Sequence, residues 1–227
     1  SVTDFHLSIR ASEVIGLAGL DGSGQELILR AASGVIKTAR GRVVVEDRDM
    51  TGKAYRQFLH CGVAFGAAGR LEEGLIAGLT LTEHVALNEP GLRVDWRGAE
   101  ANTQERLTHF NVRGRPGTQV QQLSGGNQQR FLMAMMPPRP VLLALEQPTR
   151  GLDVDSARWV GKQILGRREE GSAVLFASPD LDELMQYSDR IIVFFAGRFH
   201  ELTDIDQVTI DTLGHLIGGE FEREAHA

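Results

Sequence analysis

The chain has 227 residues, 42% of them hydrophobic and 24% charged, with a mean hydropathy of −0.15, which indicates a globular domain and excludes a disordered or fibrous protein. Lys and Arg number 24 against 30 Asp and Glu, and the net charge of −6 argues against a large basic face for nucleic acid. The longest apolar run, 191–196, is far shorter than the ~20 residues that span a membrane, which leaves a peripheral membrane role, and the single cysteine, Cys61, excludes an internal disulfide.

Apolar runs rich in Val, Ile, Leu and Phe predict the strands of an α/β sheet. They lie at 14–18, 43–45, 63–65, 141–145, 173–177 and 191–195. The last three are apolar throughout, as in parallel strands that are covered on both faces. Phe5, Leu7 and Ile9 alternate with polar residues, which predicts a half-buried strand with Phe5 in the core.

Helices are expected to begin near Gln25, Thr82, Gly98, Gly125, Asp155, Leu181 and Asp206. The glycine-containing stretch 91–118 surrounds one helical segment and predicts a more helical insert. No linker or internal repeat divides the chain, so we expect a single domain over 1–227 with a helical lobe at about 80–136.

A glycine-rich loop connects the first predicted strand to the first predicted helix. Residues 19–26 read Gly-Leu-Asp-Gly-Ser-Gly-Gln-Glu. Such a loop can turn successive backbone N–H groups toward one point at the positive end of the helix, where a di- or triphosphate binds. A tight turn into a helix is the alternative interpretation. The predicted phosphate-binding residues are Gly19, Asp21, Gly22, Ser23, Gly24, Gln25 and Glu26.

The loop departs from the phosphate-loop pattern G-x-x-x-x-G-K-[ST] at its last two positions. Gln25 replaces the lysine that neutralises the phosphates, and Glu26 replaces the hydroxyl that binds Mg²⁺. A neutral amide bonds phosphate more weakly than an ammonium does, whereas a carboxylate can itself ligate Mg²⁺. We therefore expect weakened ATP binding, with Glu26 as a candidate Mg²⁺ ligand.

Two further blocks follow in the second half of the chain. Residues 123–129 read Leu-Ser-Gly-Gly-Asn-Gln-Gln, where Ser124 suits a helix N-cap and the amides after it form an anion site. Residues 141–153 predict a buried strand that ends at Glu146, and an acid at the carboxyl end of such a strand lies where doubly wound folds bind ligands. Taken alone, the first block can equally be an ordinary capped helix, and the second an ordinary strand end.

Together, the three blocks resemble the ATP-binding cassette (ABC) ATPases over residues 12–198. Residues 123–129 are similar to the signature motif of that family, and 141–153 to its second nucleotide motif and D-loop. The resemblance implies an α/β phosphate-loop cassette fold with a mostly parallel core sheet, a small antiparallel β-subdomain and a helical subdomain. It also implies a signature-side ATP contact by Leu123, Ser124, Gly125, Gly126, Asn127, Gln128 and Asp153.

The chain differs from that family at its catalytic positions, which are Glu146, Gln147 and Pro179. Glu146 replaces the aspartate that binds Mg²⁺ through water and remains a candidate Mg²⁺ ligand. Gln147 replaces the glutamate that polarises the attacking water, and a neutral amide is a poor base. Pro179 replaces a histidine that contacts the γ-phosphate. Slow or absent hydrolysis at the chain's own loop is the expected result.

A finer resemblance concerns three segments: Pro-Thr-Arg-Gly-Leu-Asp-Val at 148–154, Gly-Asn-Gln-Gln at 126–129 and the loop Gly-Leu-Asp-Gly-Ser-Gly-Gln at 19–25. These residues look like the second cassette of tandem ATPases that energise bacterial importers of simple sugars (ribose, galactose or xylose) or nucleosides. In such importers, cassettes pair head to tail on the cytoplasmic face of a membrane permease, and a separate substrate-binding protein delivers the cargo. The resemblance therefore implies that segment 124–128 serves ATP that is bound by the partner cassette.

Other functions stay open at this point. A structural or regulatory pseudo-ATPase would hold a dimer together without nucleotide. A non-transport cassette acting on DNA or ribosomes is disfavoured by the net charge of −6. A nucleotide kinase would leave the 123–128 block unexplained.

Overall fold

The computed structural model describes residues 2, 5–89 and 93–220, which fall into two compact units. The first, here called the sheet unit, is drawn from Ser1–Phe65, Pro138–Gln147 and Gly161–Ala227. The second, the helical unit, is drawn from Gly66–Pro137 and Pro148–Val160. Within the described ranges, no helix combines the length and the apolar character needed to cross a bilayer.

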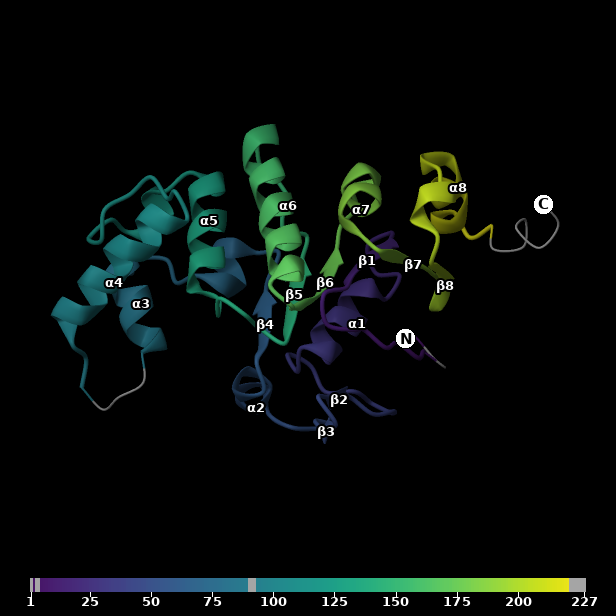
Figure 1. The fold of residues 1–227 in the computed structure, drawn as a ribbon, viewed down its shortest axis with the longest axis horizontal. Coiled ribbons are helices and arrows are strands. Elements are labelled where there is room, and N and C mark those ends of the chain that lie inside the picture. The colour runs from purple at the N-terminus through teal and green to yellow at the C-terminus, as the bar shows by residue number, and fades with distance from the viewer. Residues whose placement is uncertain (1, 3–4, 90–92, 221–227) are drawn as a thin grey trace. The chain divides into compact units, whose positions relative to one another are not determined.

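A six-stranded sheet forms the sheet unit, in the order β4-β5-β6-β1-β7-β8 (Figure 1). The strands are β1 (Val14–Gly19), β4 (Val63–Gly66), β5 (Leu142–Glu146), β6 (Ala173–Ala177), β7 (Arg190–Phe195) and β8 (Arg198–Leu202). β1 is parallel to β6 and β7, and β5 is parallel to β6, whereas β8 is antiparallel to β7. The carboxyl ends of β5, β6 and β1 therefore lie along one edge of the sheet, called the carboxyl edge below.

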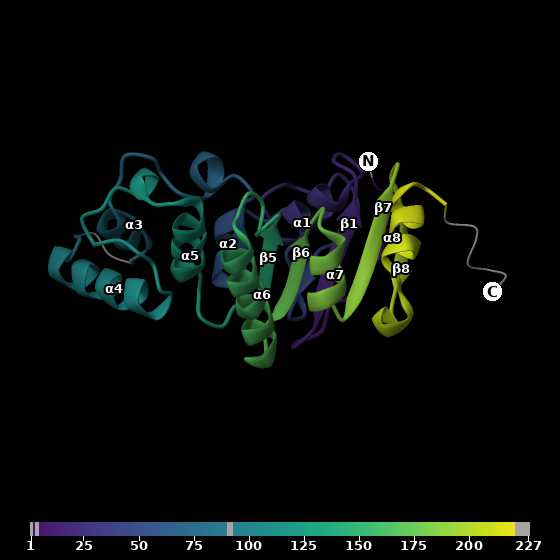
Figure 2. The ribbon, with the colours of Figure 1, turned by 90° about the horizontal axis from the view of Figure 1, so that it is seen from above.

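Helices cover both faces of this sheet, which explains its uninterrupted apolar strands. α1 (Gln25–Ala32) packs on one face, and α7 (Leu181–Tyr187) and α8 (Ile210–Ile217) on the other (Figure 2). Leu29 of α1 is fully buried in the core together with Ile15 and Leu17 of β1. A short antiparallel hairpin, β2 (Val44–Val45) and β3 (Arg48–Asp49), and α2 (Tyr55–His60) complete the unit.

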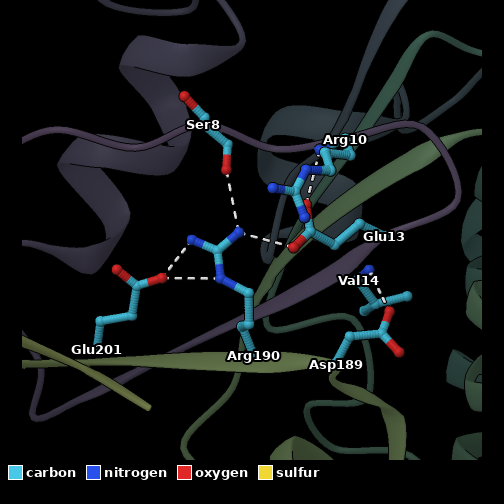
Figure 3. A network of polar contacts seen from close by, with 7 residues as sticks. All are labelled: Ser8, Arg10, Glu13, Val14, Asp189, Arg190 and Glu201. Carbon is cyan, nitrogen blue, oxygen red and sulfur yellow. Dashed lines mark hydrogen bonds and ion pairs between the residues drawn. The ribbon is translucent and has the colours of Figure 1, made fainter. Parts of the chain in front are cut away.

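An ionic network joins the amino ends of β1 and β7, at the edge opposite the carboxyl edge (Figure 3). Arg190 donates to Glu13 Oε1 (2.7 Å) and to the Ser8 carbonyl (3.1 Å), and it also pairs with Glu201. The second Glu13 oxygen accepts the Arg10 amide at 2.7 Å. This network therefore connects the N-terminal segment, β1, β7 and β8.

The helical unit contains α3 (Leu81–Asn88), α4 (Trp96–His109) and α5 (Gly125–Met135), with a π-turn at Arg70–Gly74 and a 3₁₀ turn at Val120–Gln122. α6 (Val154–Glu169) begins in this unit and ends in the sheet unit. α3 starts with a capping box, in which Thr80 Oγ1 accepts the Glu83 amide and Glu83 accepts the Thr80 amide. The core of the unit includes Phe131 and Met133 of α5, both fully buried.

The predicted fold class is confirmed, and the predicted strands are found within one residue of each end. One further strand prediction is wrong, because segment 5–9 is not a strand, and two observed strands, β3 and β8, were not predicted. Phe5 nevertheless packs on Phe194 and Phe199, with ring centroids 5.7 and 4.9 Å away, so it is a core residue as predicted.

Helix starts agree with the prediction to within two residues, except near Asp206. Asp206 lies in a 3₁₀ turn (Ile205–Gln207), and α8 begins only at Ile210, because Thr209 supplies the cap by accepting the Thr212 amide at 3.1 Å. The short helix α2 was not predicted.

Candidate functional site

The glycine loop connects β1 to α1 in the sheet unit, as predicted. Gly22 and Gly24 have φ of 82° and 122°, in the region that favours glycine. The Ser23 amide closes the turn on the Leu20 carbonyl at 2.9 Å. A Cβ at Gly24 would lie 2.3 Å from Val2 Cγ2, so a larger residue there would also have to move the Val2 side chain. The first amides of α1 have no acceptor within the helix and can bind an anion.

Gln25, at the lysine position, is directed toward its own loop. The side chain is 4% exposed, and its amide donates to the Gly19 carbonyl (3.2 Å) and the Leu20 carbonyl (2.9 Å). A glutamine amide has two N–H donors, so both are occupied. The remaining atom, Oε1, is a buried acceptor without a partner among the described residues. Gln25 therefore has no donor left for a phosphate.

Glu146, at the carboxyl end of β5, forms a two-pronged ion pair with Arg30 of α1. Arg30 Nε donates to Oε1 at 2.9 Å and Nη2 donates to Oε2 at 2.6 Å. Glu146 is 4% exposed, and the guanidinium lies 5.7 Å from the centroid of the Phe65 ring. Arg30 was not predicted as a site residue, although it is a lone basic residue in an otherwise apolar run, 27–32.

The residues around Glu146 do not fit a Mg²⁺ ion. Both carboxylate oxygens are bound by Arg30, and a metal bound to either oxygen would lie beside that positively charged guanidinium. Throughout the part of the chain that the structure describes, no group of three or more His, Cys, Asp or Glu side chains could hold a metal. Metal binding by Glu26 stays a prediction.

Gln147 and Pro179 follow the carboxyl ends of the paired strands β5 and β6, so the sheet brings these two predicted positions together. Gln147 has φ of 43°, and its backbone N–H donates to the Ala177 carbonyl at 2.8 Å. Ser178 precedes the exposed Pro179, and its hydroxyl donates to Glu183 in the first turn of α7 at 2.8 Å. Neither Gln147 nor Pro179 carries a side chain that can take a proton near neutral pH.

The 123–129 block lies in the helical unit, where α5 begins at Gly125 with Ser124 at the N-cap position. The predicted N-cap position of Ser124 is confirmed, but its hydroxyl accepts no backbone amide. It accepts instead from Asn127 Nδ2 at 2.8 Å, while Asn127 Oδ1 accepts the Arg113 amide at 2.7 Å. Ser124 is exposed. Its hydroxyl proton is consequently available to an external acceptor.

The other members of the block divide into buried and accessible residues. Leu123 and Gln128 are 7% and 8% exposed, and Gln128 donates to the Leu123 carbonyl at 3.1 Å, so both support the segment from inside. Gly125, Gly126 and Asn127 are half-exposed and open an eleven-residue helix. Their amides and the Ser124 hydroxyl form an anion-binding end.

The predicted D-loop residue Asp153 lies next to this block within the helical unit. A Cβ at Gly126 would lie 2.4 Å from Ser156 Oγ and 3.6 Å from Asp153 Oδ2. The amide and hydroxyl of Ser156 donate to Asp153 and hold the pKa of its carboxyl below the ordinary value, while burial acts in the opposite direction. Arg70 donates to the Arg150 carbonyl at 2.9 Å and adds positive charge to this unit.

A family model described as ABC transporter matches residues 2–150 of the chain. The chain is 34% identical to the nucleoside import ATP-binding protein NupA of Lactococcus lactis, over 96% of this chain and 45% of that protein. It is 33% identical to the guanosine import ATP-binding protein NupO of Bacillus subtilis, over 99% and 46% respectively. It is 30% identical to the ribose import ATP-binding protein RbsA of Streptococcus agalactiae, over 86% of this chain and 41% of that protein. The chain thus spans less than half the length of each of these relatives.

Solved structures share the fold. The structure of the ATP-binding subunit of an ABC transporter has a TM-score of 0.77 at 20% identity, covering 96% of this chain and 92% of that one. The dimeric cassette MJ0796, bound to ADP and Pi in a post-hydrolysis state, has a TM-score of 0.73 at 22% identity, covering 88% and 90%. These similarities confirm the predicted α/β phosphate-loop cassette fold.

Proposed function

The chain belongs to the ATP-binding cassettes of the ABC transporter family, and within that family we propose that it is the second cassette of a tandem importer ATPase for a simple sugar or a nucleoside. The names of the relatives support the cargo class. Residues 1–227 would form one cassette with a helical lobe at about 80–136, docked peripherally on the cytoplasmic face of a membrane permease. A partner cassette and a substrate-binding protein complete the proposed assembly.

The observation that carries this proposal is the contrast between the two anion sites. At the loop, the Gln25 donors are bonded to carbonyl groups and Glu146 is bonded to Arg30. At the 123–129 block, Ser124 is exposed and its hydroxyl proton has no acceptor among the described residues. The block thus retains the donors that a phosphate needs, so we propose that it acts in trans on ATP bound by the partner.

Hydrolysis at the chain's own loop is proposed to be slow or absent. Replacement of a charged hydrogen-bond donor by a neutral one removes roughly 1 kcal/mol from phosphate binding. A missing general base removes typically a further 10²–10⁴-fold from the rate. ATP binding at 19–26 is then weakened, and turnover comes from the partner's site.

Replacing Ser124 by arginine in the assembly with its partner cassette tests the trans role. S124R places a bulky cation where the hydroxyl is exposed, and we expect ATPase turnover to fall to background, at least a hundredfold. Thr108→Arg makes a similar change at an exposed position of α4 and should leave turnover within twofold. Undiminished turnover of S124R would defeat the trans role.

A nucleotide-free scaffold is the second candidate function. It is favoured by Gln25, whose side-chain amide donates to two carbonyl groups of the loop without any ligand. In that case the chain would only hold the partner in its dimer. Saturable binding of labelled ATP to the chain would exclude this function.

A further inference from the structure

The Arg30–Glu146 pair occupies the carboxyl edge of the sheet unit, where the loop after β1 also lies. Glu146 is the only buried acid at this edge among the described residues, and its side chain is 5% exposed. Arg30 comes from the second turn of α1, the helix that begins at the loop. The helix that supplies the phosphate-binding amides therefore also supplies the positive charge that neutralises Glu146.

This geometry satisfies the carboxylate without a metal. The guanidinium and the carboxylate meet through two parallel hydrogen bonds, at 2.9 and 2.6 Å, which is the strongest arrangement for this pair of groups. Mg²⁺ needs near-octahedral oxygen ligands and binds through freely available carboxylates. A Mg²⁺ ion bound directly to Glu146 would share the carboxylate with Arg30 and would be repelled by the like charge of its guanidinium.

The side chain at the lysine position of the loop does not favour a metal–phosphate complex. Gln25 presents only a buried Oε1 acceptor, and its two N–H donors are bonded to the Gly19 and Leu20 carbonyls. Phosphate binding must then rely on the amides at the start of α1. These amides bind a phosphate oxygen whether or not a cation accompanies it.

We propose that Arg30 is the resident counter-ion of Glu146 and replaces the divalent cation, so that the loop of this chain binds nucleotide without Mg²⁺. The inference rests on the proposed function only in taking 19–26 as a nucleotide site. It requires nothing of Ser124. Failure here would therefore leave the trans role of the signature block intact.

Titration of the 227-residue chain with a fluorescent (mant) derivative of ATP, in Mg²⁺ or in EDTA, tests the inference. The wild type is expected to bind with dissociation constants that agree within twofold in the two buffers. Arg30→Gln releases the Glu146 carboxylate, and Mg²⁺ should then tighten binding tenfold or more. R30K keeps the positive charge and should stay independent of Mg²⁺.

The matched control is Arg168→Gln, which breaks another arginine–carboxylate pair of the sheet unit, with Asp189 at 2.8 Å. R168Q should bind as the wild type does in both buffers. The double variant R30Q/E146Q should lose the Mg²⁺ response that R30Q gains. A wild type that binds tenfold more tightly with Mg²⁺, or that shows no saturable binding, overturns the inference, and so does a folded R30Q without a metal response.

Discussion

At the scale of single residues, Asn127 decides what the Ser124 hydroxyl can do. Its Nδ2 donates to Ser124 Oγ and its Oδ1 is held by the Arg113 amide, so the orientation of the amide group is fixed at both ends. A hydroxyl that accepts one hydrogen bond directs its proton elsewhere. Asn127 is thus a positioning residue for the donor that the partner's phosphate would meet.

We expect Asn127→Ala to lower ATPase turnover of the paired assembly about fivefold, since one neutral hydrogen bond contributes about 1 kcal/mol. In a Ser124→Ala background the same change should have almost no effect, because the two residues act through one hydroxyl. The control is Asn102→Ala, which removes from α4 a side-chain amide that donates to Glu89. Equal losses in both backgrounds would show a merely structural role for Asn127.

At the scale of elements, the sequence predicts what is determined locally. Apolar runs identify β5, β6 and β7 because both faces of these strands are buried. β3 is exposed and β8 is only partly buried, so neither has a run of apolar residues. Both strands form by antiparallel pairing with a neighbouring strand, which no local sequence pattern shows. The glycine loop and the 123–129 block are local motifs and were found. Arg30 was missed, because its pair joins residues 116 positions apart.

The packing of α7 on β1 depends on Gly16. A Cβ at this position would lie 2.4 Å from Ser188 Oγ and 2.7 Å from Leu184 Cδ2. We expect Gly16→Ala to lower the free energy of unfolding by about 1–3 kcal/mol, measured by urea denaturation. Gly166→Ala in α6 meets nothing within 4 Å, and a helical alanine should raise stability by about 0.5–1 kcal/mol. Changes of the same sign in both variants would contradict this packing argument.

At the scale of the whole molecule, stability in acid depends on carboxylates that are hydrogen-bonded in the folded state. Glu13 belongs to the sheet unit, and Glu83 and Asp153 to the helical unit. Burial raises the pKa of the Glu13 carboxyl, but Arg190 and the Arg10 amide lower it more. Hydrogen bonds from Thr80 lower the pKa of Glu83, as those from Ser156 lower the pKa of Asp153. Both units should therefore lose stability as the pH falls.

Glu13→Gln isolates one of these contributions. Because the folded-state pKa lies below the ordinary value of 4.5, the stabilisation is present above that pH and is lost as the pH falls through the folded-state pKa. We expect E13Q to lower the free energy of unfolding by about 1–2 kcal/mol at pH 7, since it removes a charged hydrogen bond to Arg190. In strong acid, where Glu13 is protonated, wild type and variant should be equally stable. Glu169→Gln, at the exposed end of α6, is the control and should match the wild type at pH 7. A deficit of E13Q that stayed constant from neutral to strongly acidic pH would mean that Glu13 acts by its shape and not by its charge.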